Sequence, residues 1–228
     1  MSKNIAAVIL AAGQGTRMKS ELPKVLHRLS GEPLLGHVVT LAKALQANPV
    51  VPVIGHGAEE VRKALADQEL IFALQEEQLG TGHALQCAVG ALQDFEGDLL
   101  LLCGDVPLLR LSTLEKLVAH HRNTAAAISI LTAEMENPTG YGRIIRGPDG
   151  VERIVEEKDA SDEERLVREI NTGIYLFQAP QVFDLLKKID NCNAQGEYYL
   201  TDVISTARQL DERVEAVVAE CAEETMGI

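Results

Sequence analysis

The chain has 228 residues, of which 46% are hydrophobic and 24% are charged, and its net charge is −13. This length suits one large α/β domain or two small ones; the acidic charge argues against nucleic-acid binding, and no apolar stretch reaches the roughly 20 residues of a membrane span. The N-terminal residues lead into an expected strand instead of a signal peptide, and the four cysteines lack the spacing of a metal site, so we expect a cytoplasmic protein with reduced thiols.

Apolar strands alternate with amphipathic helices through the first half of the chain. We expect strands at residues 5–10, 50–54, 71–74, 99–103 and 126–131, and helices at residues 34–47, 58–66, 81–92 and 111–123. Strands that are apolar on both faces are typical of parallel sheets covered by helices. The pattern predicts an α/β, Rossmann-like fold with a mostly parallel central sheet and helices on both faces. Ligands bind such sheets beyond the carboxyl ends of the strands, so we expect the chemistry in the loops after residues 10, 74, 103 and 177.

The second half of the chain has a different pattern, which begins near residue 138. The turn sequence Gly147-Pro148-Asp149-Gly150 predicts a β-hairpin between strands 143–146 and 151–155. The remaining expected elements are a strand at 170–177, helices at 180–189 and 199–210, and a strand at 214–218. We interpret residues 1–228 as a single domain, with residues 1–137 as one part and residues 138–228 as a smaller, hairpin-containing part.

The loop after the first strand has the composition of a phosphate-binding loop. It reads Leu10-Ala11-Ala12-Gly13-Gln14-Gly15-Thr16-Arg17-Met18, and Pro23-Lys24 follows. Glycines let backbone N–H groups approach an anion closely, and Arg17 and Lys24 supply positive charge. The alternative is a plain strand-to-helix turn with surface cations. A dinucleotide fingerprint needs a glycine where Met18 stands, and a Walker-type loop needs one where Pro23 stands, so neither motif fits.

Acidic and amide side chains follow two later strands of the predicted sheet. Asp105, in Gly104-Asp105-Val106-Pro107, follows strand 99–103, where its carboxylate suits Mg²⁺, although an Asp in this position also caps turns. Gln75 offers both a donor and an acceptor to a base edge, Gly80 allows close backbone approach, and Thr81 is a good helix N-cap. We expect His83 to be structural. The paired His120 and His121 fit a helix end better than a metal site.

Three further segments have the groups that bind sugars. Gly140 lies in a turn rich in hydrogen-bonding groups, Glu156 follows a strand, and Asn171 lies early in a strand. Carboxylates, amides and backbone groups bind sugar hydroxyls, but each of these signals is weak alone. The segment 196–199 reads as a loop that either closes over a sugar or is simply solvated.

Taken together, these segments resemble the uridyltransferase domain of the bacterial N-acetylglucosamine-1-phosphate uridyltransferase/glucosamine-1-phosphate N-acetyltransferase family, which is a nucleotide-diphospho-sugar transferase. The specific matches are Gln78-Leu79-Gly80-Thr81-Gly82-His83-Ala84, Gly140-Tyr141-Gly142-Arg143-Ile144 and Asn193-Ala194-Gln195-Gly196-Glu197-Tyr198-Tyr199. The resemblance covers nearly the whole chain. It makes residues 1–137 the nucleotide-binding part and residues 138–228 the sugar-binding part.

The resemblance implies the site residues. Arg17 and Lys24 are the expected catalytic residues, and Asp105 is the expected ligand of an Mg²⁺ cofactor. The expected substrate contacts are Leu10, Ala11, Ala12, Gly13, Lys24, Gln75, Gly80, Thr81, Cys103, Gly104, Asp105, Gly140, Glu156 and Asn171. Cys103 stands where members often carry tyrosine. The family's second metal ligand is an asparagine that would directly follow Gly227-Ile228, so we expect a truncated domain.

The implied reaction joins UTP and N-acetylglucosamine 1-phosphate into UDP-N-acetylglucosamine and pyrophosphate. Two alternatives stay open. The first is another nucleotidyltransferase, either a methylerythritol-phosphate cytidylyltransferase or an enzyme for a different hexose 1-phosphate. The second is a weakly active or inactive protein that only binds nucleotide sugars. The full-length family protein continues into a β-helix acetyltransferase domain that builds a homotrimer. We expect that domain to be missing from this chain, and we expect the remaining part to be compatible with a monomer.

Overall fold

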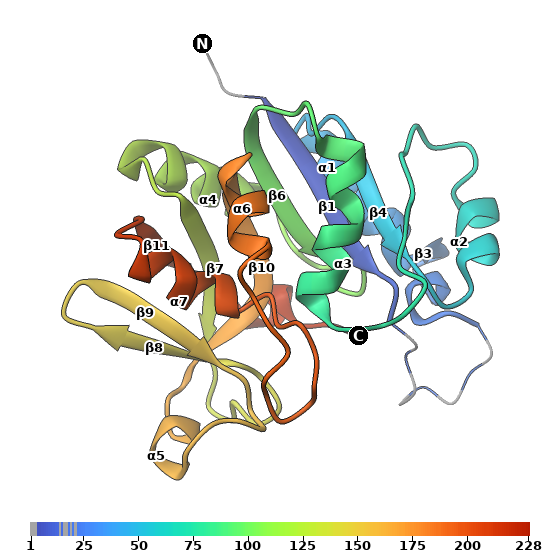
Figure 1. Ribbon diagram of the computed structural model, residues 1–228. Coiled ribbons are helices and arrows are strands. Elements are labelled where there is room, and N and C mark those ends of the chain that lie inside the picture. Colours follow the sequence, from blue (N-terminus) through green and yellow to red (C-terminus); the bar gives the residue numbers. More distant parts are fainter. Residues whose placement is uncertain (1–3, 14, 16–17, 19, 21) are drawn as a thin grey trace.

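A nine-stranded mixed sheet runs through the molecule, with helices on both faces (Figure 1). The computed structural model describes residues 4–13, 15, 18, 20 and 22–228. Seven strands form the main path of the sheet in the order β11 (Val214–Val218), β7 (Ile128–Glu134), β10 (Glu169–Ala179), β6 (Gly97–Cys103), β1 (Ile5–Ala11), β4 (Val50–Ile54) and β5 (Ala73–Leu74). The predicted α/β fold with a mostly parallel sheet is confirmed.

Strand β10 runs against its neighbours. It pairs antiparallel with β6 and β7, whereas β1 pairs parallel with β4 and β6, and β4 with β5. The segment after residue 177 therefore lies at the opposite edge of the sheet from the carboxyl ends of β1 and β6. The expectation of chemistry there is wrong, because the alternation of helices and strands does not reveal the direction of one inserted strand. The amino end of β10, with Asn171, lies at the ligand-binding edge instead.

Consecutive leucines in β6 build the core on both faces of the sheet. Leu99 and Leu101 point to the face covered by α3, α6 and α7, while Leu100 and Leu102 point to the face covered by α1, α2 and α4. All four side chains are buried, and each contributes on the order of 2 kcal/mol to folding. The helices are α1 (Leu34–Ala44), α2 (Ala58–Ala64), α3 (Thr81–Ala88), α4 (Leu111–Thr124), α6 (Gln181–Leu186) and α7 (Asp202–Gln209). None of the helices in the described ranges is both long and apolar enough to cross a bilayer.

The predicted hairpin is present and projects from the side of the sheet (Figure 1). Strands β8 (Arg143–Gly147) and β9 (Gly150–Val155) pair antiparallel, and β8 meets β10 through Arg143 and Ile170. Gly150 has a φ of +102°, which an L side chain rarely adopts, so glycine is required at this turn. The hairpin and β10 together form one wall beside the carboxyl ends of the parallel strands.

Several short elements and element ends differ from the prediction. The predicted helix 81–92 changes into a 3-10 helix, η3, at Val89, and the predicted helix 199–210 begins only at Asp202. Residues 200 and 201 are held instead by side chains from other parts of the fold. Elements with no sequence signal are β2 (Arg28–Leu29), β3 (Glu32–Pro33), α5 (Asp162–Arg165), η2 (Lys24–Leu26) and η4 (Ala222–Thr225).

Candidate active site

Gly15, in the loop after β1, lies against Lys24. Ala11 and Ala12 are buried, and Gly13 is exposed. Gly15 has a φ of +58°, and a Cβ on it would lie 2.7 Å from Cβ of Lys24, so only glycine fits here. Arg17, the other predicted catalytic cation, lies outside the described residues.

A contact with the loop after β4 positions Lys24. Gly57 has a φ of +65°, and a Cβ on it would lie 2.2 Å from Cγ of Pro23. Pro23 therefore packs directly on the backbone of Gly57. Val25 and Leu26 are buried beyond it, so the short η2 helix that begins at Lys24 is held from both sides. Pro23, which excludes a Walker-type loop, is thus the residue that positions Lys24.

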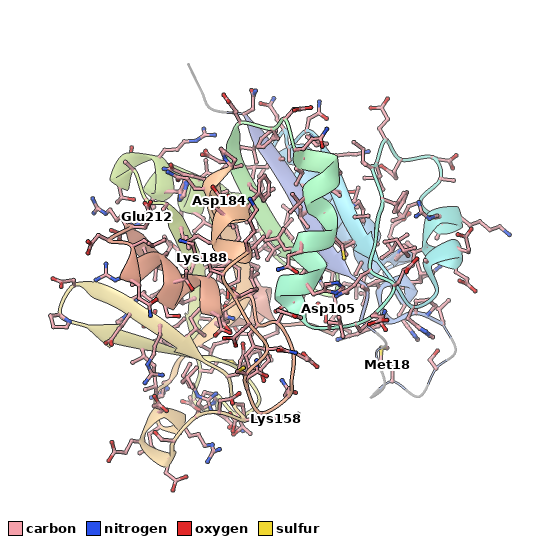
Figure 2. The ribbon with its side chains drawn as sticks, in the orientation of Figure 1. Met18, Asp105, Lys158, Asp184, Lys188 and Glu212 are labelled. Atoms are coloured by element: carbon pink, nitrogen blue, oxygen red, sulfur yellow. The ribbon has the colours of Figure 1, made fainter. Side chains whose placement is uncertain are left out.

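Lys24 reaches Asp105 across the edge of the sheet. Its Nζ donates to Oδ2 of Asp105 at 2.6 Å, and the two side chains are 26% and 29% exposed. The predicted juxtaposition of the first loop and the loop after β6 is confirmed. Figure 2 shows Asp105 at the sheet edge, and Figure 1 shows the C-terminal end in the same region. The N–H of Ile228 donates to the carbonyl oxygen of Asp105 at 3.0 Å, and a Cβ on Gly227 would lie 3.0 Å from Oδ2.

The surroundings of Asp105 fit a divalent cation that is shared with a ligand. Within the described ranges, three or more His, Cys, Asp or Glu side chains do not gather anywhere in a way that would hold a metal by themselves. Mg²⁺ is commonly held by one or two carboxylates, with phosphate oxygens and waters as the other ligands. A half-exposed carboxylate beside a phosphate-type loop suits that coordination.

The amide of Gln75 is fixed from two sides. Gln75 is 3% exposed, and its Nε2 lies 3.1 Å from the carbonyl oxygen of Gly80 and 3.1 Å from Nδ1 of His83. His83 therefore contacts the side chain of Gln75, and that it is not itself a catalyst stays a prediction. Thr81 is not the helix cap, because Gly80 takes that position and Oγ1 of Thr81 accepts from the N–H of Leu200 at 3.1 Å. Thr81 instead fastens the segment that precedes α7.

Glu156 and Asn171 lie on either side of Gly142. A Cβ on Gly142 would lie 3.4 Å from Oε2 of Glu156 and 3.5 Å from Cβ of Asn171. Burial raises the pKa of the Glu156 carboxyl, although Oε1 accepts from Oγ1 of Thr201 at 3.1 Å. Oδ1 of Asn171 accepts from the N–H of Gly173 and from the hydroxyl of Tyr175, which leaves its Nδ2 as a donor.

Gly140 is exposed near these two residues, and its N–H donates to Oε2 of Glu157 at 3.1 Å. Nη2 of the buried Arg143 donates to the same oxygen at 2.7 Å. These bonds lower the pKa of the Glu157 carboxyl, with Arg143 as the larger cause. Glu157 therefore shapes the turn around Gly140.

Comparisons with known proteins agree with this geometry. Residues 7–172 match the family model described as the MobA-like NTP transferase domain. The chain belongs to this NTP transferase family. The matched range contains Lys24, Gln75, Asp105, Glu156 and Asn171.

Relatives of this NTP transferase domain extend over almost its whole length. It is 60% identical over 224 residues to the "Bifunctional protein GlmU" of Syntrophotalea carbinolica, which covers 98% of this chain and 48% of that protein. It is 52% identical over 227 residues to the protein of the same name in Geobacter sulfurreducens, covering 99% and 48%. The chain thus spans about half the length of the curated relatives it matches. The resemblance inferred from the sequence is confirmed.

The fold of this NTP transferase domain also matches solved structures. A UDP-glucose pyrophosphorylase complexed with UDP-glucose superposes with a TM-score of 0.74 at 18% identity, covering 96% of this chain and 90% of the other. A putative glucose-1-phosphate thymidylyltransferase from Bacillus anthracis superposes with a TM-score of 0.76 at 18% identity, covering 95% and 87%. At this identity the likeness concerns the fold alone.

The segment at residues 198 and 199 connects the loop at residues 75–80, here named the base-side loop after its predicted role, with the turn after β9. The N–H of Tyr198 donates to the carbonyl oxygen of Leu79, and the N–H of Gly82 donates to the carbonyl oxygen of Tyr198. On the other side, the hydroxyl of Tyr199 donates to Oδ2 of Asp159 at 3.2 Å. The sequence singled out this segment for its loop composition but contained no signal for Asp159. Whether the segment closes over a sugar stays a prediction.

Cys103 and Gly104 lie where β6 ends. Sγ of Cys103 lies 3.5 Å from the carbonyl oxygen of Gly173, and a Cβ on Gly173 would lie 2.8 Å from this sulfur. Burial, together with the charge of Asp105, raises the pKa of the Cys103 thiol to about 12. The N–H of Gly104 donates to the carbonyl oxygen of Leu10 at 2.9 Å, which joins the two loops.

Proposed function

We propose that this domain transfers a uridylyl group from UTP to N-acetylglucosamine 1-phosphate, giving UDP-N-acetylglucosamine and pyrophosphate. The observation that carries the proposal is the Lys24–Asp105 pair, which lies at the sheet edge between a base-side loop and the Glu156–Asn171 wall. Membership of the NTP transferase family and similarity to GlmU proteins over the whole chain support the assignment.

In this mechanism, a phosphate oxygen of the sugar phosphate attacks the α-phosphorus of UTP in line. A bond forms between them, and the bond from the α-phosphorus to the bridging oxygen of pyrophosphate breaks. The attacking group needs no general base, because a phosphate monoester is largely ionised at neutral pH, with a second pKa near about 6. The task of the protein is to align two anions and to offset their repulsion.

Lys24 and Arg17 are the proposed catalytic cations. The Nζ of Lys24 is held at the sheet edge by the Pro23–Gly57 contact, so it is positioned before substrate arrives. It would donate to the phosphate chain and offset the negative charge that grows on the leaving pyrophosphate. The role of Arg17 is proposed from the sequence motif alone.

Asp105 is the proposed ligand for a divalent cation, with Mg²⁺ as the specific choice. When bound, Mg²⁺ neutralises phosphate charge. The N–H of Ile228 donates to the carbonyl oxygen of Asp105 at 3.0 Å, so residues 227 and 228 lie beside the proposed metal ligand.

The substrate contacts follow from the groups that the fold leaves available. On the base side, the oxygen of the Gln75 amide accepts from the base, while Ala11, Ala12, Gly13, Gly80 and Thr81 surround it. Leu10, Cys103 and Gly104 complete the floor where β1 and β6 end. On the sugar side, the carboxylate of Glu156 accepts from hydroxyls, Nδ2 of Asn171 donates, and the turn at Gly140 supplies backbone groups.

Pyrophosphate release from UTP and each of several sugar phosphates tests the proposal, with and without Mg²⁺. We expect release with UTP and N-acetylglucosamine 1-phosphate only when Mg²⁺ is present. Preference for CTP and methylerythritol phosphate, or for another hexose 1-phosphate, would favour a different nucleotidyltransferase. Binding of UDP-N-acetylglucosamine without release would favour a nucleotide-sugar-binding protein. The cytoplasmic location and the homotrimer of the full-length protein remain predictions.

A further inference from the structure

A hydrogen-bonded row of three side chains runs from Gln75, in the loop before α3, to His83 and Cys87 within α3. Nε2 of Gln75 lies 3.1 Å from Nδ1 of His83, and Nε2 of His83 lies 3.8 Å from Sγ of Cys87, one helical turn later. Gln75 is buried, and burial raises the pKa of the Cys87 thiol, so the sulfur stays uncharged. The row therefore has no net charge when the imidazole is neutral. Its residues influence one another only through which atom donates and which atom accepts each hydrogen bond.

The neighbours of Gln75 determine where its amide NH₂ and its amide oxygen lie. The carbonyl oxygen of Gly80 can only accept, so the amide group 3.1 Å from it must be the NH₂. The second hydrogen of this NH₂ requires another acceptor, and Nδ1 of His83 supplies it if the imidazole carries its proton on Nε2. Sγ of Cys87 lies where that Nε2–H would point. Both hydrogens of the amide are then bonded within the protein.

The consequence concerns the ligand. Among the interactions of the described residues, none engages Oε1 of Gln75, so the amide presents only an acceptor to a base. Uracil carries an N–H at position 3 and matches an acceptor. Cytosine carries a lone pair at position 3 and would face the amide oxygen acceptor to acceptor.

We propose that His83 is a specificity-determining positioning residue, which accepts the second amide hydrogen of Gln75 and so leaves only the amide oxygen facing the base. This inference rests on the proposed function, because it explains how the site chooses UTP over CTP. His83 acts through Gln75 and does not itself contact the base.

Replacing His83 by leucine tests this role. In His83→Leu, the NH₂ of Gln75 keeps only the carbonyl oxygen of Gly80 as an acceptor, so turning the amide over costs one hydrogen bond fewer. A turned amide presents its NH₂ to position 3 of the base, where cytosine has a lone pair that accepts and uracil has an N–H that cannot accept. An unsatisfied buried donor costs about 1–3 kcal/mol, so we expect the ratio of kcat/KM for UTP to that for CTP to fall about tenfold. In His83→Asn, the side-chain oxygen replaces Nδ1 at the same distance from the backbone, and the ratio should return to within about threefold of the original.

A matched control is His120→Leu, which removes a histidine near the end of α4 that pairs with Glu215. Its UTP-to-CTP ratio should stay unchanged. Thermal unfolding of each variant shows whether it is folded. An unchanged ratio in folded His83→Leu, or an equal fall in His83→Leu and His83→Asn, would overturn the role of His83.

A measurement on the unsubstituted protein tests the role of His83 even if the variants fail to fold. Nitrogen-15 NMR at pH 8 should show the proton of the His83 ring on Nε2, and a proton on Nδ1 would overturn the proposal. If the protein releases no pyrophosphate from either nucleotide, the proposed function fails. The affinities of UDP and CDP, measured by calorimetry, then replace kcat/KM, and the same tenfold change in their ratio decides the role of His83.

Discussion

Nζ of Lys24 lies 2.6 Å from Oδ2 of Asp105, although the two residues are 81 positions apart in the chain. They meet because β1 and β6 are adjacent parallel strands whose carboxyl ends reach the same edge of the sheet. A half-exposed ion pair of this kind adds about 0–1 kcal/mol to stability. For the proposed function, it means that the proposed metal ligand and the proposed catalytic amine lie side by side before any ligand arrives.

Replacing Lys24 should damage catalysis far more than folding. We expect Lys24→Ala to lower kcat by about 10²–10³ while the free energy of unfolding changes by less than about 1 kcal/mol. Lys187→Ala is the control, because Lys187 also forms an ion pair with an aspartate but is 74% exposed. Steady-state kinetics and urea unfolding measure both effects, and a Lys24→Ala enzyme of near-normal rate would contradict the proposed role. Arg17→Ala should show a loss of the same order.

Adding a methyl group at Gly57 should displace Lys24 indirectly. In Gly57→Ala, the left-handed backbone costs about 1–2 kcal/mol, and the new Cβ collides with Pro23. We expect lower stability together with a reduced kcat. Gly90→Ala is the matched control, because Gly90 has open space around it and no positive φ, so its stability should stay the same or rise. Equal behaviour of the two variants would contradict the packing argument.

The Glu156 side chain should lower the stability of the fold at neutral pH and strengthen binding of the sugar phosphate. Its folded-state pKa is raised by burial above the ordinary value of 4.5, so its neutral form favours folding below that pH and this contribution is lost as the pH rises. Glu156→Gln should therefore be more stable than the unsubstituted protein at pH 7, and the difference should vanish at acidic pH. The KM for the sugar phosphate should rise about tenfold. Calorimetric unfolding at several pH values measures the difference. A Glu156→Gln variant less stable than the unsubstituted protein at pH 7 would contradict the prediction.

Cys103 should be the slowest thiol to react. With a pKa raised to about 12, only about one molecule in 10⁴ carries the reactive thiolate at pH 8. Cys192 is exposed and should be alkylated first. Mass spectrometry after timed iodoacetamide treatment would contradict the burial argument if Cys103 reacted as fast as Cys192.

Much of this arrangement follows from the sequence. Buried apolar runs predicted the parallel strands, and a shared sheet edge then brought Lys24 near Asp105, as expected. The direction of β10 was not predictable, because an apolar strand such as 170–177 has no signal for parallel or antiparallel pairing. That single direction decides whether Asn171 or the segment after residue 177 reaches the site.

Contacts between residues far apart in the chain account for the other differences between the predicted and the observed structure. Thr81 has the composition of an N-cap, yet it binds the N–H of Leu200, which no local pattern reveals. Asp159 and Glu224 likewise gain their roles from tertiary contacts: Glu224 is buried and accepts from the N–H of Arg110 and the hydroxyl of Thr113 at the start of α4. The Gln75 amide lies against the carbonyl oxygen of Gly80 and against His83, eight residues later, and no local pattern reveals this second contact.

A crystal structure with UDP-N-acetylglucosamine and Mg²⁺ tests the central claim most directly. The account predicts a phosphate oxygen within roughly 3 Å of Nζ of Lys24, the metal on Asp105, uracil against Gln75 and the sugar between Glu156 and Asn171. A bound nucleotide whose phosphorus atoms lie far from Lys24, with that lysine turned to bulk solvent, would contradict it.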